Sequence, residues 1–105
     1  MATEWIRVCA ANEIEQDDLR RFDHGDRTFV VYRTADDEYY ATDGLCTHEK
    51  VHLADGFVVG DVIECPKHNG CFDFRTGAAT RRPARTPLRT WPVKVEGGDV
   101  FLQLD

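Results

Sequence analysis

Two short motifs, each pairing a cysteine with a histidine, restrict most strongly how this chain can fold. The pairs are Cys46-x-His48 and Cys65-x-x-His68, and 16 residues separate them. Thiolates are soft ligands that suit iron–sulfur clusters and zinc, and imidazole suits iron and zinc. We therefore expect two facing loops that hold one metal centre. A single tetrahedral zinc could use the same four side chains, so the spacing alone leaves the metal open.

A third pattern overlaps the first motif, because His48, Glu49 and His52 spell the zinc-protease signature His-Glu-x-x-His. That signature works only on a helix, where two histidines four residues apart share one face and the glutamate activates water. Gly44 and Gly56 bracket this stretch closely and leave little room for a helix. We therefore expect a loop here, with His52 near the mouth of the metal site.

The size and charge of the chain narrow its class. A chain of 105 residues supports one domain with one modest core. Its formal net charge of −6 repels nucleic acid phosphates. We find neither a signal peptide nor an apolar run that could cross a bilayer, so we expect a cytoplasmic monomer with no nucleic acid or membrane partner. In that reducing compartment, four cysteines indicate metal binding more than disulfides, and Cys9 and Cys71 should be small, partly buried hydrophobes.

Short strands separated by turn residues dominate the rest of the sequence, as expected for β-branched and aromatic residues between Gly-containing turns. Residues 14–22 should be a loop with a strand after it, and the stretch around Pro83, Pro87 and Pro92 should be irregular. This spacing predicts an all-β sandwich or small barrel. The predicted strands are residues 4–9, 28–33, 39–42, 93–95 and 100–104, with a turn at 23–26, a tight hairpin over 58–64 and a short strand around Phe72 and Phe74.

At the metal motifs the sequence resembles Rieske proteins, whose pattern is Cys-x-His, about sixteen residues, then Cys-x-x-His. The resemblance extends to Gly44, Pro66, Gly70, Phe72, Asp73 and Gly77. Over its whole length the chain is similar to the small Rieske-type ferredoxins of multicomponent aromatic-ring-hydroxylating dioxygenases. This resemblance implies the Rieske fold in one domain, 1–105, in which a cluster-binding subdomain of about 44–81 is inserted in an antiparallel β-sandwich base of 1–43 and 82–105.

The resemblance also implies one [2Fe–2S] cluster per chain. Cys46 and Cys65 would bind one iron, and His48 and His68 would bind the other, which lies nearer to solvent and accepts the electron. The implied function is electron transport and not catalysis: single electrons pass from a flavin-containing, NAD(P)H-dependent ferredoxin reductase to a terminal non-haem iron oxygenase of aromatic hydrocarbon catabolism. No small-molecule substrate has to bind. Two alternatives stay open: a Rieske subunit of another redox enzyme, such as a nitrite reductase or P450 system, and a structural Cys₂His₂ zinc module.

This sequence departs from the high-potential respiratory Rieske proteins at positions near the cluster. Those proteins join the two cluster loops by a disulfide where this chain has Val51 and Lys67, and they place hydroxyl groups where it has Gly70 and Phe72. Hydroxyl donors stabilise the reduced, more negative form of a cluster. We therefore expect a midpoint potential near the low end of the Rieske range, which spans about −150 to +300 mV.

Charge is distributed unevenly along the chain. Residues 75–95 carry 6 basic residues and no acid, whereas residues 1–43 carry 11 acids and 5 bases. Complementary charge raises the rate at which proteins associate. We therefore expect some of Arg81, Arg82, Arg85 and Arg89 to flank the cluster edge and to meet an acidic patch on a partner. The competing interpretation is that these arginines pair internally with the N-terminal acids, where exposed pairs contribute little.

Overall fold

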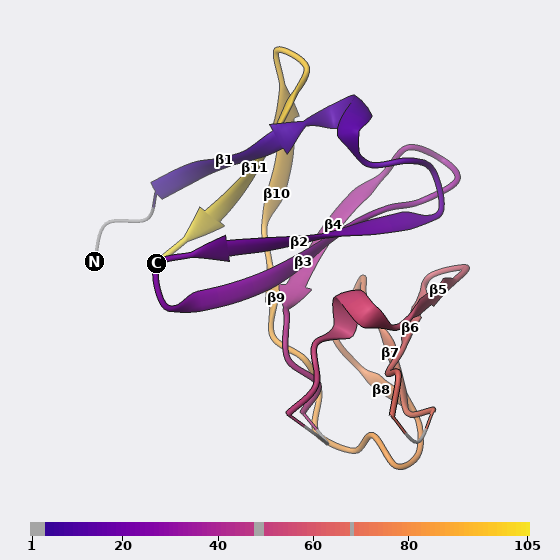
Figure 1. The fold of residues 1–105 in the computed structure, drawn as a ribbon. Helices are drawn as coiled ribbons and strands as arrows, with labels where there is room; N and C mark the ends of the chain where they lie inside the picture. Colours follow the sequence, from indigo (N-terminus) through magenta and orange to yellow (C-terminus); the bar gives the residue numbers. More distant parts are fainter. Residues whose placement is uncertain (1–3, 48–49, 68) are drawn as a thin grey trace.

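The computed structural model describes residues 4–47, 50–67 and 69–105. Within these ranges the chain consists mainly of short antiparallel strands and the turns between them (Figure 1). The strands form three sheets, and the middle sheet separates two hydrophobic cores.

The first sheet joins strands from the two ends of the chain. Its strands, in spatial order, are β1 (Glu4–Ala10), β11 (Asp99–Leu104) and β10 (Val93–Glu96). The turn between β10 and β11 is tight because Gly97 and Gly98 have φ values of 61° and 82°, a conformation that glycine adopts without steric cost. Alternate residues of β11 are buried on one face, namely Val100, Leu102 and Leu104.

The second sheet lies in the middle of the molecule. Its strands, in spatial order, are β2 (Asp18–His24), β3 (Arg27–Arg33), β4 (Tyr39–Asp43) and β9 (Thr90–Trp91). Along β3, residues 29–32 are almost completely buried. Because successive side chains of a strand point to opposite faces, β3 contributes to the interior on both sides of this sheet.

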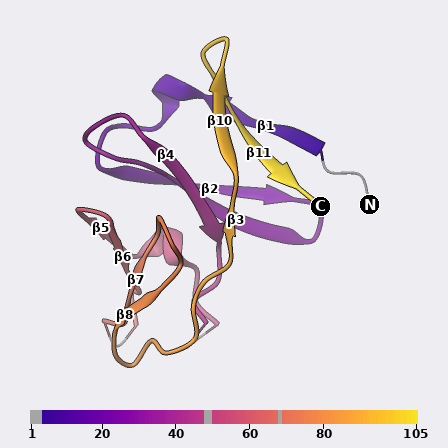
Figure 2. The same ribbon diagram turned by 180° about the vertical axis from the view of Figure 1, so that it is seen from behind.

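The third sheet is formed by the part of the chain between β4 and β9. Its strands follow one another in space as in the sequence: β5 (Phe57–Val59), β6 (Val62–Glu64), β7 (Cys71–Asp73) and β8 (Ala79–Arg81). Figures 1 and 2 show this small sheet on the far side of the middle sheet from β1, β10 and β11. Each of its strands is three residues long, so its stability depends on packing more than on its own ladder.

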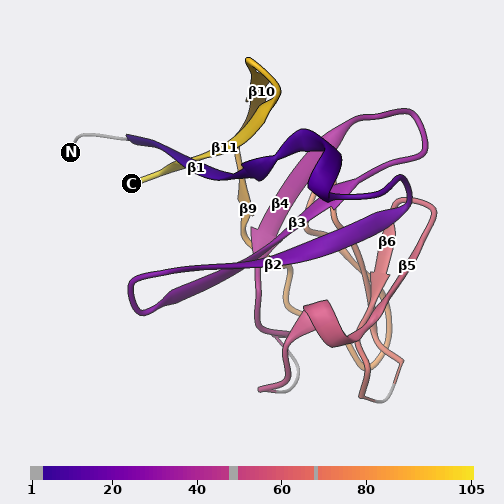
Figure 3. The ribbon, with the colours of Figure 1, turned by 45° about the horizontal axis from the view of Figure 1, so that its top comes forward.

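Two buried clusters lie on the opposite faces of β3. The basal core lies between the first and second sheets, which cross in Figure 3. It consists of Cys9, Ile14, Phe29, Val31, Ala41, Trp91, Val100, Leu102 and Leu104. The loop-side core lies between the second and third sheets. It consists of Val30, Tyr32, Cys46, Leu53, Ile63, Cys65, Phe72, Phe74, Ala84 and Leu88.

The all-β prediction is confirmed, and the turn expected at 23–26 and the hairpin expected over 58–64 are present. β9 differs from the prediction, since the stretch around Pro83, Pro87 and Pro92 was expected to be irregular. Its pairing with β4 comes from tertiary contacts, and β8, for which no strand was predicted, pairs with β7. Two single-turn 3₁₀ helices, η1 (Ala11–Glu13) and η2 (Leu53–Asp55), are too short to show a periodic pattern. None of the helices in the described residues has the length and hydropathy needed to cross a bilayer.

Candidate metal centre

The first predicted motif lies in a loop that leaves the end of β4 and ends at η2. Hydrogen bonds close the base of this loop: the Gly44 N–H donates to the Thr28 carbonyl (2.9 Å), and the Leu53 N–H donates to the Gly44 carbonyl (2.8 Å). Further along the loop, the Cys46 N–H donates to the Val51 carbonyl (3.0 Å). These bonds fix the backbone of Cys46, which is only 5% exposed.

His52 forms hydrogen bonds through both of its ring nitrogens, one to the first turn of η2 and one to β3 of the middle sheet. Nδ1 accepts a hydrogen bond from the Ala54 N–H (3.1 Å), so the proton of the neutral ring lies on Nε2, 2.7 Å from the Thr28 hydroxyl oxygen. Thr28 donates in turn to an Asp23 carboxylate oxygen at 2.6 Å. Burial lowers the pKa of His52 and favours the neutral ring. A Cβ on Gly44 would lie 2.6 Å from His52 Nε2, so this close approach requires glycine.

The second predicted motif lies in the loop between β6 and β7. The Cys65 N–H donates to the Gly70 carbonyl (2.7 Å) and closes this loop at its base. Asn69 has a φ of 60°, a left-handed conformation that asparagine adopts more readily than most residues. Cys65 is 1% exposed and belongs with Cys46 to the loop-side core. Two thiols from different loops are therefore buried in one region.

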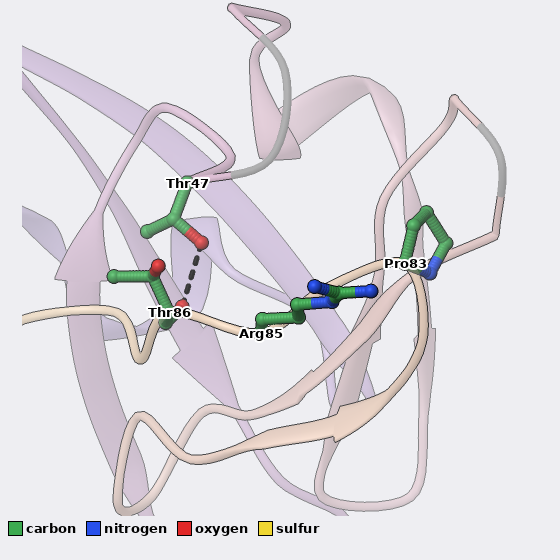
Figure 4. Close-up of a pocket in the computed structure, with 4 residues that line it drawn as sticks. All are labelled: Thr47, Pro83, Arg85 and Thr86. Carbon is green, nitrogen blue, oxygen red and sulfur yellow. Dashed lines mark hydrogen bonds between the residues drawn. The ribbon is translucent and has the colours of Figure 1, made fainter.

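A third segment, residues 82–88, packs against both loops. The Thr47 hydroxyl donates to the Thr86 carbonyl at 2.6 Å, the dashed line in Figure 4. On the other side, a Cβ on Gly70 would lie 3.0 Å from the Ala84 nitrogen, so these backbones approach closely because Gly70 has no side chain. A cavity of about 380 Å³ lies here, and its described lining is Thr47, Pro83, Arg85 and Thr86.

The structure brings two of the four predicted ligands, Cys46 and Cys65, into one core, whereas His48 and His68 lie outside the described residues. Residues 4–47, 50–67 and 69–105 by themselves contain no group of three or more His, Cys, Asp or Glu side chains that could hold a metal ion. Both thiols are free of disulfides. Two reduced, soft ligands buried among apolar side chains suit an iron–sulfur cluster, so the donors that are described fit such a group.

The geometry does not support a zinc protease. Residues 50–52 are not helical, although the signature requires its second histidine on a helix. Both ring nitrogens of His52 are already hydrogen-bonded. We expected His52 near the mouth of the site, but it is buried at the base of the loop, where it caps η2.

Comparison with known proteins decides the family. Residues 4–92 match the family described as the Rieske [2Fe-2S] domain. The chain belongs to the Rieske family. Its cofactor is accordingly a [2Fe–2S] cluster, in agreement with the two buried thiols.

Several similar proteins are named as ferredoxins or ferredoxin components. The ferredoxin component of the 2,4-dinitrotoluene dioxygenase system of Burkholderia sp. (strain RASC) is 39% identical over 105 residues, which cover 100% of both chains. Ferredoxin CarAc of Metapseudomonas resinovorans is 39% identical over 99 residues, or 93% of this chain and 92% of the relative. A chain in the complex of reduced oxygenase and oxidized ferredoxin in carbazole 1,9a-dioxygenase has a TM-score of 0.88 and 38% identity, covering 93% of this chain and 91% of that chain.

The other two cysteines of this Rieske chain are buried, more completely than the partial burial that we predicted. Cys9 is 2% exposed in the basal core, and Cys71 is 8% exposed in β7. The Cys71 sulfur lies 3.6 Å from the Asn69 carbonyl oxygen. Burial raises the pKa of both thiols, so both stay protonated near neutral pH and are poor nucleophiles.

Three contacts that shape this Rieske site do not follow from the motifs: Thr47 with Thr86, His52 with Thr28, and Gly70 with Ala84. Each joins segments that are far apart in the sequence. The available signals were weak, because a threonine inside Cys-x-His looks like a spacer. A histidine directly before a short turn can be recognised as a helix cap only when the helix itself is expected.

Proposed function

We propose that this chain is a Rieske ferredoxin whose [2Fe–2S] cluster is bound by Cys46, His48, Cys65 and His68. The proposal rests on one observation above all: Cys46 and Cys65 meet in the loop-side core of a chain that aligns along its full length with a ferredoxin component of a dioxygenase system. Two thiolates and two imidazoles are the ligands that distinguish Rieske centres from other [2Fe–2S] centres. In this assignment the cysteines bind one iron and the histidines bind the other.

A bound Rieske cluster supplies reversible one-electron chemistry. The residues of the chain provide its surroundings. Leu53, Ile63 and Phe72 are fully buried in the same core as the two thiols, and such apolar side chains exclude water from that core. Because Cys46 and Cys65 also donate backbone hydrogen bonds that close their own loops, the chain presents its thiolates from a fixed frame.

The chain transfers electrons and does not itself activate oxygen. A non-haem iron oxygenase binds its iron with two histidines and one carboxylate. The sequence contains four histidines, of which His48 and His68 are assigned to the cluster. His52 uses both ring nitrogens in hydrogen bonds. Since His24 alone remains, this chain cannot supply an oxygenase iron site.

We assign a flavin-containing, NAD(P)H-dependent reductase as the electron donor and a terminal non-haem iron oxygenase as the acceptor. The carbazole 1,9a-dioxygenase complex of oxygenase and ferredoxin supports the second assignment, because its 38% identical chain shares this fold. The relatives named above favour an oxygenase over a nitrite reductase or a P450 system. A cytoplasmic monomer is the simplest form for such a carrier.

We further propose that residues of about 44–81 form a cluster-binding subdomain inserted between 1–43 and 82–105. Two observations support this division of the single domain. The strands β5 to β8 form a sheet of their own, and the residues around Cys46 and Cys65 form a core distinct from the basal core.

The test is reconstitution of electron transfer with purified, cluster-containing protein. The chain is mixed with NADH, a flavoprotein reductase, and a terminal oxygenase of an aromatic dioxygenase system together with its aromatic substrate. The hydroxylated product is then measured. We expect product only when the chain is present, full activity for Cys9→Ser and none for Cys65→Ser. Electron transfer to a nitrite reductase or a P450, and to no oxygenase, would favour the alternative acceptors. Bound zinc without sulfide would indicate a structural zinc module.

A further inference from the structure

Most arginines of this chain are paired with a carboxylate of the same chain. Eight of its ten arginines lie within 4.0 Å of an Asp or Glu oxygen. The pairs are Arg7–Asp99, Arg20–Glu13, Arg21–Asp23, Arg27–Asp105, Arg33–Asp37, Arg75–Asp73, Arg81–Glu64 and Arg89–Asp105. Among the residues that the structure describes, neither Arg82 nor Arg85 has a carboxylate partner. Within the described part of the chain, whose full sequence has a net charge of −6, these two guanidinium groups are therefore the ones without a carboxylate partner.

Both of these arginines lie on the third segment, beside the loops that carry the proposed ligands. Both are exposed. Arg85 lines the cavity together with Thr47, which directly follows Cys46 in the sequence, and in Figure 4 it extends toward Pro83. The hydrogen bond from Thr47 to the Thr86 carbonyl anchors the backbone next to Arg85. These two positive charges thus lie beside the loops that carry the proposed cluster ligands.

The structure divides the four arginines that the sequence singled out. Arg81 lies 3.7 Å from Glu64. Arg89 bonds to Asp105 at 2.8 Å and stacks on Trp91 at 3.8 Å, so it belongs to the basal part of the fold. The internal pairing expected by the competing interpretation occurs for these two, although their partners are not N-terminal acids.

We propose that Arg82 and Arg85 form a docking site for surface carboxylates of the terminal oxygenase, at the place where electrons leave this chain. This inference rests on the proposed function. Guanidinium groups bind carboxylates through two parallel hydrogen bonds, and both arginines are available for such bonds. Nucleic acid, another polyanion that arginines bind, is repelled by the net charge of the chain. A protein partner that carries a small patch of carboxylates can contact the two arginines without approaching the acidic remainder of this chain.

A matched pair of double variants tests the site. Arg82→Glu/Arg85→Glu reverses the proposed docking charge, and Arg7→Glu/Arg20→Glu reverses two exposed arginines on β1 and β2. Each arginine replaced by glutamate changes the charge by −2, so both double variants have a net charge of −6 − 4 = −10. Differences between them therefore report position and not total charge. Cluster content and visible spectrum should match the wild-type protein in both.

The first measurement uses small inorganic oxidants and needs no partner protein. The reduced protein is mixed in a stopped-flow instrument with anionic ferricyanide or cationic hexaamminecobalt(III), and each rate is recorded across ionic strength. Relative to the control variant, Arg82→Glu/Arg85→Glu should react roughly tenfold more slowly with ferricyanide at low salt and faster with the cobalt complex. The difference should fade at high salt. Equal rates for the two variants would show that these arginines do not lie at the electron exit.

The second measurement uses the oxygenase that supports turnover in the reconstitution. Surface plasmon resonance should show roughly tenfold weaker binding for Arg82→Glu/Arg85→Glu than for the control at low salt. Arg82→Lys/Arg85→Lys keeps both charges and should retain most of the affinity. If the wild-type chain supports turnover but both glutamate variants bind equally, the docking site is wrong and the proposed function stands. If no oxygenase accepts electrons from the wild-type chain, the proposed function fails and the docking proposal fails with it.

Discussion

The two faces of β3 border interiors of different chemistry. On one face, Phe29 and Val31 pack into the basal core, which is closed by apolar side chains from β1, β9 and β11. On the other face, Val30 and Tyr32 pack into the loop-side core, which contains Cys46, Cys65 and residues of the third segment. The basal core should be stable by apolar burial alone. The loop-side core includes two proposed ligands, so its stability should be linked to cluster binding.

Replacing a buried cysteine in each core should give the largest difference. Cys65→Ser or Cys46→Ser removes a proposed thiolate ligand, and we expect complete loss of the cluster, measured as iron, acid-labile sulfide and visible absorption. Cys9→Ser makes the same chemical change in the basal core, and Cys71→Ser makes it in β7. Both should retain the full iron and sulfide content. Cluster loss in the Cys9 variant would show that the two interiors do not differ in this way.

Large-to-small substitutions should give the next largest difference between the two cores. Phe72→Ala removes a fully buried ring from the loop-side core and should lower the free energy of unfolding by about 3–5 kcal/mol. Leu102→Ala removes a fully buried side chain from the basal core and should cost about 2–5 kcal/mol. In urea titrations, Phe72→Ala should lose visible absorption before far-UV circular dichroism, whereas in Leu102→Ala both signals should change together. If the two signals changed together in both variants, cluster binding would not be linked specifically to the stability of the loop-side core.

His52 connects the first metal-motif loop to the middle sheet by a hydrogen bond to Thr28. Removing this contact should lower stability less than the core substitutions do. His52→Ala removes the cap of η2 and the bond to Thr28, and it should cost about 1–3 kcal/mol and speed cluster loss in urea. His52→Asn keeps an acceptor for the Ala54 N–H and should cost about half as much. His24→Ala, an exposed histidine on β2, is the control and should change neither quantity.

The pH dependence of stability should show the smallest effect. The folded protein lowers the pKa of His52 below its ordinary 6.5, mainly by burial and also through Arg21, while Asp23 and Asp55 oppose the shift. Between the lowered pKa and about 6.5 the unfolded chain binds more protons, so stability should rise with pH in this window and be fully present above it. Urea midpoints from pH 5 to 7.5 measure this rise. The rise should be smaller in His52→Asn; an identical profile would assign it to other groups.

The sequence predicts the framework better than its connections. Strands over residues 28–33 and 39–42 and the hairpin over 58–64 could be predicted because side-chain type and turn residues define them locally. Residues 14–22 were expected as a loop with a strand after it, yet β2 already begins at Asp18. β2 carries polar side chains on its exposed positions, and its pairing with β3 outweighs their weak strand propensity.

The candidate site shows the same division. The spacing of the motifs indicated that Cys46 and Cys65 belong together, and the structure places both in one core. The contact of Thr47 with Thr86 and the approach of Ala84 to Gly70 depend on the path of the third segment. Nothing in the local sequence specifies that path, because the prolines indicate only an irregular backbone. The distinction between paired and free arginines likewise required the folded chain.

The ligand assignment is the central claim, and pulsed electron paramagnetic resonance of the reduced protein tests it most directly. A [2Fe–2S] cluster bound by Cys46, His48, Cys65 and His68 becomes paramagnetic when it takes up one electron, and two histidine nitrogens should couple to that spin. Labelling the histidines with nitrogen-15 should change both couplings. A paramagnetic cluster without coupled histidine nitrogen, or a protein that accepts no electron, would contradict the Rieske ligand set assigned to this chain.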